Sequence, residues 1–201
     1  MSNTNDYYNS NSQTFFESTI QADLSHLYER FLQYVPDQGK ILDLGCGSGR
    51  DVKAFKDLGY VVDAMDASEE LVKLATAHTG IQVRQQRFED LTEQNGYDAV
   101  WACASLLHVE YDKLPDILTK INRALKKNGI FYMSFKLGDH DGQRDGRYFT
   151  DMNDDRFNKL NTDQIGFTTV DKWRTRDARP DRDVEWFNVI LKKSAKGELL
   201  C

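Results

Sequence analysis

The chain has 201 residues, of which 40% are hydrophobic and 29% are charged, and its formal net charge is −6. This length and composition are typical of one soluble globular domain with a full core, so we expect a single domain over residues 1–201. No apolar run is long enough to cross a bilayer and the first residues lack a secretory signal pattern, so we expect no membrane association and a cytoplasmic location. The net negative charge is spread along the chain, which disfavours nucleic acid as a partner because phosphate binding needs a basic face.

Two local patterns exclude further classes of protein. Cys46, Cys103 and Cys201 are widely separated and have no second Cys or His at metal-ligand spacing, so we expect neither disulfide bonds nor a zinc site. The one basic stretch, residues 174–182, alternates arginines with aspartates, which favours a solvated loop over an anion site.

The first predicted elements precede any strand. Residues 1–13 are polar and rich in Asn and Ser, a composition typical of a flexible segment, and Tyr7 and Tyr8 are the exceptions. Apolar residues then recur at three- and four-residue steps over residues 20–35, which predicts a helix that ends at Pro36.

Strands and helices alternate through the middle of the chain. The predicted strands are Lys40–Leu44, Tyr60–Met65, Ile81–Arg87, Asp98–Cys103 and Ile130–Lys136. The helix after the first strand is predicted to bury a face formed by Val52, Phe55 and Leu58. Ser68 is predicted to cap the next helix, and Lys126 and Lys127 are predicted to end the last one.

The pattern changes after Lys136. We expect a loop over Leu137–Arg147, a short helix over Asn153–Leu160, and an antiparallel pair formed by Phe167–Arg174 and Val184–Lys192. The alternation before this point predicts an α/β fold with a doubly wound, mostly parallel sheet. Ligands bind such sheets beyond the carboxyl ends of the strands.

The stretch ILDLGCGSGRD, residues 41–51, places three glycines between the first strand and the next helix. Such a turn lets backbone N–H groups approach a ligand closely, and the first candidate is a dinucleotide. The dinucleotide pattern, however, needs glycine where this chain has Arg50. Asp43 is poorly placed beside a pyrophosphate and well placed for an ammonium group. The turn therefore indicates an adenosine derivative without phosphates.

A second carboxylate, Asp66, ends the second predicted strand, where it can accept hydrogen bonds from both hydroxyls of a ribose. A GxGxG turn alone is a weak signal, and an Asp at a strand end is often only a helix cap. The two together, in a strand–turn–helix–strand context, favour a nucleoside site.

Five segments in this order, DLGCGSGRD, VVDAMDAS, RFEDL, YDAVWACASLLHV and ALKKNGIFYMSF, resemble the motifs of the class I S-adenosylmethionine-dependent methyltransferases. Within that superfamily the chain is similar to small bacterial enzymes of the tellurite-resistance and trans-aconitate methyltransferase type. The resemblance implies a Rossmann-like sheet of seven strands, with S-adenosyl-L-methionine as cofactor and S-adenosyl-L-homocysteine as product. It divides the chain into a lid segment (1–18), a cofactor-binding core (19–137) and an acceptor-side region (138–201).

The resemblance also implies roles for individual residues. The implied cofactor-binding residues are Asp43, Gly45, Gly47, Gly49, Arg50, Asp66, Ala67, Phe88, Glu89 and Ala104. Asp43 would hold the amino acid end of the cofactor, and Asp66 the ribose. Arg87 stands where the family often has an acidic residue. Arg50 could contact the cofactor carboxylate or pair with Asp51, and the sequence leaves both open.

Methyl transfer from a sulfonium is an in-line displacement that needs alignment and a dry site more than an acid or a base. The chain lacks the Asn/Asp-Pro-Pro-aromatic pattern of amino-group methylation and the Pro-Cys nucleophile of cytosine methylation. With the acidic charge, this indicates a small-molecule acceptor. His108 could be a catalytic base or a structural side chain.

Three further residues are candidates for acceptor binding. Lys136 and Arg147 could hold a carboxylate or oxyanion, or the aspartates of the same loop could neutralise them. Tyr8, with Tyr7, could close over the site as a lid or belong to a disordered tail.

Three functions compete at this stage. The first is a methyltransferase acting on a small, anionic acceptor as a monomer or weak dimer. The second is a catalytically silent regulatory protein that binds S-adenosylmethionine. The third, a nicotinamide or flavin oxidoreductase, is disfavoured by Arg50 in place of glycine.

Overall fold

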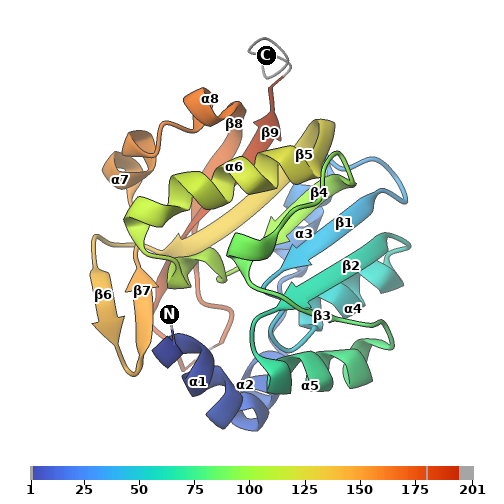
Figure 1. Ribbon diagram of the computed structural model, residues 1–201, viewed down its shortest axis with the longest axis vertical. Helices are drawn as coiled ribbons and strands as arrows, with labels where there is room; N and C mark the ends of the chain where they lie inside the picture. The colour runs from blue at the N-terminus through green and yellow to red at the C-terminus, as the bar shows by residue number, and fades with distance from the viewer. Residues whose placement is uncertain (1, 180, 195–201) are drawn as a thin grey trace.

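Seven strands form one mixed sheet in the order β3-β2-β1-β4-β5-β9-β8 (Figure 1). The computed structural model describes residues 2–179 and 181–194, and Cys201 lies outside them. The strands are β1 (Lys40–Leu44), β2 (Val61–Asp66), β3 (Arg84–Gln85), β4 (Tyr97–Ala102), β5 (Leu125–Lys136), β8 (Phe167–Arg176) and β9 (Glu185–Lys193). Strands β1 to β5 pair in parallel, and β9 lies antiparallel between β5 and β8. The predicted fold class and the antiparallel pair are confirmed.

Helices cover both faces of this sheet and its carboxyl edge. The α-helices are α1 (Ser2–Ser10), α2 (Ser12–Thr19), α3 (Ser25–Leu32), α4 (Arg50–Asp57), α5 (Glu69–Thr79), α6 (Leu114–Ala124), α7 (Asp154–Lys159) and α8 (Thr162–Ile165). Short 3₁₀ helices are η1 (Phe88–Asp90), η2 (Leu106–His108) and η3 (Tyr111–Lys113). Among the described residues, no helix has the length and apolar character that crossing a bilayer requires.

The core has two parts, one on each face of the sheet. One cluster packs α6 and α7 against the sheet through residues such as Ile117, Leu118 and Phe157. The other packs α3, α4 and α5 on the opposite face and is rich in aromatic residues. In it, Trp101 of β4 stacks on Tyr132 of β5 with 4.0 Å between ring centroids. This packing holds the strand ends that carry the polar residues described below.

The sequence predicts a flexible N-terminal tail followed by one long helix, and the structure differs from this prediction. Residues 2–19 form α1 and α2, and a turn over residues 20–24 separates α2 from α3. Helix α2 packs against α5, where the Phe16 ring of α2 lies 5.6 Å from the His78 ring of α5. In Figure 1, α1 and α2 lie beyond the carboxyl ends of β1 and β2. Tertiary contacts therefore order a segment whose composition is typical of disorder.

Three predicted boundaries were wrong for identifiable reasons. Strand β3 has only two residues, because the chain leaves the sheet edge and turns through η1. Lys126 and Lys127 do not end α6 but belong to β5, whose first residue pairs with Tyr97 of β4. Leu58 is 57% exposed instead of buried, because α4 ends at Asp57, one residue before it.

The loop expected over residues 137–147 contains a hairpin instead. Strands β6 (Asp141–Arg144) and β7 (Arg147–Thr150) pair antiparallel around Asp145 and Gly146. Both turn residues have positive φ, 52° and 74°, as a two-residue Asp-Gly hairpin turn requires. The hairpin stands beside α1 at the edge of the molecule (Figure 1).

We expect Phe55→Ala to destabilise the fold by about 3–5 kcal/mol, because it empties a fully buried position. The Phe55 ring contacts Tyr28 and Trp101 at centroid distances of 5.1 Å and 5.3 Å. Leu58→Ala is the matched control just after the same helix, and it should change the free energy of unfolding by less than about 0.5 kcal/mol. Urea denaturation of both variants measures the difference, and equal losses would contradict the assigned packing.

Candidate active site

The glycine turn between β1 and α4 is possible only with glycine at three positions. Gly45, Gly47 and Gly49 have φ values of 80°, 53° and 78°, which L side chains rarely adopt. A Cβ on Gly45 would lie 2.6 Å from the Cβ of Ser105, and one on Gly49 would lie 2.7 Å from Thr79 Cγ2. The turn is therefore tightly packed as well as left-handed.

Asp66 fastens this turn to the start of α5. Its carboxylate accepts one hydrogen bond from Gly47 N–H and another from Ser68 N–H, both at 2.9 Å. Ser68 in turn caps α5 through Leu71 N–H, as predicted. Burial raises the pKa of Asp66, and the backbone N–H donors oppose that rise. The side chain thus stands at the turn and at a helix start, where a sugar could reach it.

Several predicted cofactor residues gather around one small cavity of about 120 Å³. Its lining includes Gly45, Gly47, Asp66, Ala67, Phe88, Glu89 and Ala104. Phe88 reaches the cavity because η1 turns the chain back toward Gly45. Sequence reasoning missed Phe15 of α2, which also lines this space.

Asp43 is a buried carboxylate with an unsatisfied oxygen. It is 2% exposed, and its Oδ2 atom has no hydrogen-bond partner within the part of the chain that the structure describes. Burial raises the pKa of Asp43, and the charge of Asp51 raises it further. A buried acceptor of this kind fits a cationic or N–H donor group from a ligand.

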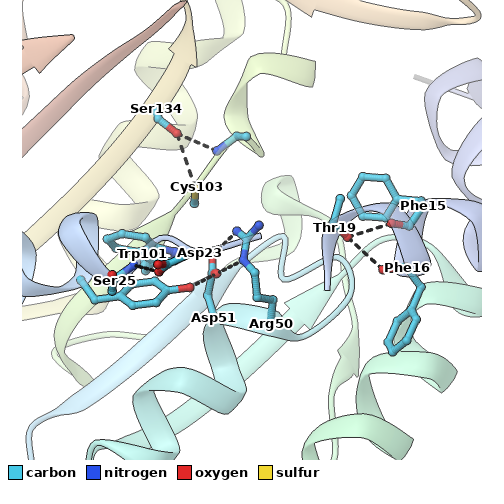
Figure 2. Close-up of polar contacts among 12 residues, drawn as sticks. Phe15, Phe16, Thr19, Asp23, Ser25, Arg50, Asp51, Trp101, Cys103 and Ser134 are labelled. Atoms are coloured by element: carbon cyan, nitrogen blue, oxygen red, sulfur yellow. Dashed lines mark hydrogen bonds and ion pairs between the residues drawn. The ribbon is translucent and has the colours of Figure 1, made fainter. Parts of the chain in front are cut away.

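Arg50 and Asp51 face each other at the start of α4 (Figure 2). Arg50 Nε lies 2.6 Å and Arg50 Nη2 lies 3.1 Å from the two carboxylate oxygens. The carboxylate also accepts from the hydroxyl of Tyr28 and from Nε1 of Trp101, at 2.6 Å and 2.8 Å. Although burial opposes it, these partners hold the pKa of Asp51 below its ordinary value. Of the two roles open to Arg50, the structure shows the pairing with Asp51.

A second, larger cavity of about 320 Å³ begins at the glycine turn and reaches Lys136 and Arg147. Its floor includes Ala104 and Ser134, which are joined by a 2.8 Å hydrogen bond from Ala104 N–H to the Ser134 hydroxyl. Ala104 has a φ of 50°, so the chain turns sharply where β4 ends. Both cavities share Gly45, Gly47 and Ala104 in their linings.

The far end of this cavity is cationic. Lys136 Nζ lies 4.2 Å from the centre of the Phe149 ring, and the guanidinium carbon of Arg147 lies 5.0 Å from it. Within residues 2–179 and 181–194, no carboxylate forms an ion pair with Lys136 or Arg147, and Arg147 Nε is buried without a partner. Burial lowers the pKa of Lys136, and the charge of Arg144 lowers it further.

The carboxylates near Lys136 and Arg147 bind other residues. Asp151 pairs with Arg144 at 3.0 Å, and Asp141 accepts from the hydroxyl of Tyr148 at 2.6 Å. The predicted neutralisation of Lys136 and Arg147 by loop aspartates is therefore absent among the described residues.

The basic stretch 174–182 contributes to the rim of the larger cavity. Arg176 lines it from the end of β8, and Arg179 and Arg182 line it from the turn between β8 and β9. Arg179 pairs with Asp177 at 2.7 Å, and Arg176 and Arg182 are exposed. The side chains of Arg176 and Arg182 are exposed, as expected for a solvated loop. Their position at the cavity was not predicted.

His108 in η2 uses both of its ring nitrogens within the protein. Its Nδ1 lies 2.7 Å from the backbone carbonyl oxygen of Tyr148, and its Nε2 lies 2.7 Å from the hydroxyl of Tyr8. Burial lowers the pKa of His108 to about 4. The imidazole is therefore neutral near pH 7 and lies beside Lys136 and Arg147 in the cavity wall.

We expect Gly45→Ala to destabilise the protein by about 2 kcal/mol or more, because it combines a left-handed backbone with a clash against Ser105. Gly80→Ala is the matched control, since Gly80 has a φ of 70° but no atom within 4 Å of the added Cβ. The control should lose only about 1 kcal/mol. Urea denaturation measures both, and equal losses would mean that the turn is less closely packed than described.

Part of the chain is similar to known methyltransferases. Residues 41–129 match the family model described as a methyltransferase domain. The ubiquinone biosynthesis O-methyltransferase of Xanthomonas axonopodis pv. citri (strain 306) is 38% identical over 118 residues, which are 51% of this chain and 47% of the relative. The putative methyltransferase YqeM of Bacillus subtilis (strain 168) is 30% identical over 140 residues, 62% of this chain and 57% of the relative. The chain thus matches about half the length of these curated relatives.

A solved structure shares the fold over almost the whole chain. The 1,6-didemethyltoxoflavin-N1-methyltransferase of Burkholderia thailandensis, crystallised with 1,6-didemethyltoxoflavin and S-adenosylhomocysteine, is similar with a TM-score of 0.74 and 21% identity. The similarity covers 94% of this chain and 87% of that chain. The chain thus resembles a methyltransferase domain over residues 41–129 and shares the fold of this solved methyltransferase over almost its whole length.

Proposed function

We propose that this protein transfers a methyl group from S-adenosylmethionine to a small anionic acceptor, a carboxylate or another oxyanion. The observation that carries the proposal is the larger cavity, which runs from the glycine turn to Lys136 and Arg147. Neither cation forms an ion pair with a carboxylate within the described ranges, so an anion entering the cavity would meet positive charge that no direct partner neutralises.

The residues at the other end of the site fit the proposed cofactor. The unsatisfied Oδ2 of Asp43 suits an ammonium group, and the buried carboxylate of Asp66 suits a pair of ribose hydroxyls. Ala67, Phe88 and Glu89 would enclose the adenine in the smaller cavity. When bound, the cofactor supplies an electrophilic methyl group on a sulfonium.

An anionic acceptor agrees with the state of His108. An oxyanion already carries the electron pair that forms the new O–C bond, while the electrons of the broken C–S bond return to sulfur and no proton moves. Because burial lowers the pKa of His108 to about 4 and both of its nitrogens are engaged, its imidazole is a weak base with no free site for a proton. Lys136 and Arg147 would orient the acceptor oxygen for the displacement.

The tests below distinguish two other functions from the proposed one. The names of the ubiquinone biosynthesis relatives indicate a hydroxyl acceptor, which must lose a proton on methylation. A silent regulatory protein would bind the cofactor without turnover, although the cavity beyond the glycine turn leaves room for an acceptor. The finer similarity to tellurite-resistance and trans-aconitate methyltransferases is compatible with an anionic acceptor.

We expect Asp66→Asn to weaken S-adenosylmethionine binding by about tenfold to a hundredfold, because hydrogen bonds to a charged acceptor are lost. Asp63→Asn on the same strand is the matched control, since Asp63 pairs with Lys40 outside both cavities. Calorimetric titration with S-adenosylmethionine and S-adenosylhomocysteine measures the affinities. If the unsubstituted protein binds neither compound, the proposed cofactor site is wrong.

We expect tritiated methyl groups to be transferred to members of a carboxylate and oxyanion panel more readily than to a matched phenol panel. For the acceptor so found, Arg147→Gln should raise KM by about tenfold or more, because a charge-assisted hydrogen bond is lost. Arg174→Gln is the control, since this exposed arginine pairs with Asp154 and does not line the cavity. Preferential methylation of phenols, or equal effects of the two variants, would contradict an anion site at Arg147.

A further inference from the structure

Helix α1 is fastened across the mouth of the site at three points. The Tyr8 hydroxyl contacts His108 Nε2 at 2.7 Å, and Thr4 Oγ1 accepts from the backbone N–H of Tyr148 at 2.9 Å. On the other side, the Ser68 hydroxyl donates to Asn9 Oδ1 at 2.7 Å. The helix therefore bridges β7 and the start of α5.

The contacts of His108 determine its tautomer. A carbonyl oxygen only accepts, so Nδ1 must carry the hydrogen that it donates to Tyr148. In a neutral imidazole, Nε2 then accepts, and the hydrogen of the Tyr8 hydroxyl must point at it. His108 thus fixes the direction of the Tyr8 O–H bond and leaves the oxygen lone pairs facing the other way.

Arg147 lies close to Tyr7 and Tyr8 and so depends on α1 for part of its surroundings. Its guanidinium carbon lies 4.3 Å from the centre of the Tyr7 ring and 5.8 Å from that of Tyr8. Phe149 of its own strand, at 5.0 Å, covers it from the sheet side. Burial raises the pKa of Tyr8, and the neighbouring Arg147 opposes that rise. The cation is held between rings from α1 and a ring from β7.

We propose that His108 is a positioning residue which, through the Tyr8 hydroxyl, docks α1 and sets the guanidinium of Arg147 for acceptor binding. The inference rests on the proposed function for the role of Arg147, and on contacts within this chain for the rest. The acceptor site is complete only when α1 is docked, so docking of α1 and binding of an anion at Arg147 favour each other.

The test uses two amide substitutions of His108, and each keeps one of its two hydrogen bonds and loses the other. In His108→Gln, the terminal amide takes the place of Nε2 and can still accept from Tyr8. In His108→Asn, the shorter amide takes the place of Nδ1 and can still donate to the Tyr148 carbonyl, but it does not reach Tyr8. Neither amide can act as a base, so a difference between the variants reports on positioning.

Two measurements on the full chain need no acceptor. Hydrogen exchange of the α1 amides reports docking of the helix. The side-chain Nε–H resonance of Arg147, assigned with Arg147→Lys, reports its place between the Tyr7 and Phe149 rings through their ring-current shift. We expect His108→Gln to keep the shift and the protection of α1, and His108→Asn to lose the shift and exchange α1 amides about tenfold faster.

The outcomes separate this inference from the proposed function. If both variants resemble the unsubstituted protein, or if both lose α1 docking equally, the link through Tyr8 is wrong. Failure of S-adenosylmethionine binding in the calorimetric titration would overturn the proposed function and leave these two readouts unaffected. With an acceptor in hand, His108→Gln should retain most of the turnover, whereas a catalytic base at this position would lose it in both variants.

Discussion

The buried carboxylate of Asp51 is the constraint on which the arrangement of the site depends. A charge removed from water must be compensated within the protein, and Asp51 is compensated by Arg50, Tyr28 and Trp101. These donors come from α4, α3 and β4, so one carboxylate fixes a helix start against another helix and the sheet. The glycine turn leads directly into the start of α4, so the contacts of Asp51 also constrain the path of the turn.

The two ends of the site have opposite electrostatic character. Asp43 and Asp66 stand at the glycine turn, whereas Lys136 and Arg147 stand at the far end of the larger cavity. A sulfonium at the acidic end and an oxyanion at the basic end would lose their charges together as the methyl group passes between them. Charge loss of this kind is favoured in a dry, weakly polarisable environment relative to water. The charge distribution would thus hold both reactants while the protein interior favours their conversion to products.

Much of the local structure around the glycine turn could be predicted from sequence because its signals are local. The glycine turn, Asp66 and the Ser68 cap lie within a few residues of the elements they define, so their spacing alone indicates their roles. The partners of Asp51 could not be found in this way, since Tyr28 and Trp101 are brought there only by packing of α3 and β4. Similarly, α1 has a composition typical of disorder, and contacts with β7 and α5 order it. One missed element did have a signal: Asp145-Gly146 is a favoured hairpin turn.

The cationic end of the larger cavity is built largely from two hairpins at the margin of the sheet. In the first hairpin, β7 supplies Arg147 and Phe149; in the second, the end of β8 supplies Arg176 and the turn before β9 supplies Arg182. The buried strands β1 and β4, by contrast, lead into the glycine turn and the Ala104 turn. Hairpin tips tolerate substitution and insertion better than buried parallel strands do. In evolutionary terms, lineages carrying this domain could diverge in acceptor preference by changing the hairpins, while the nucleoside-binding half and the aromatic core stay under separate selection for stability.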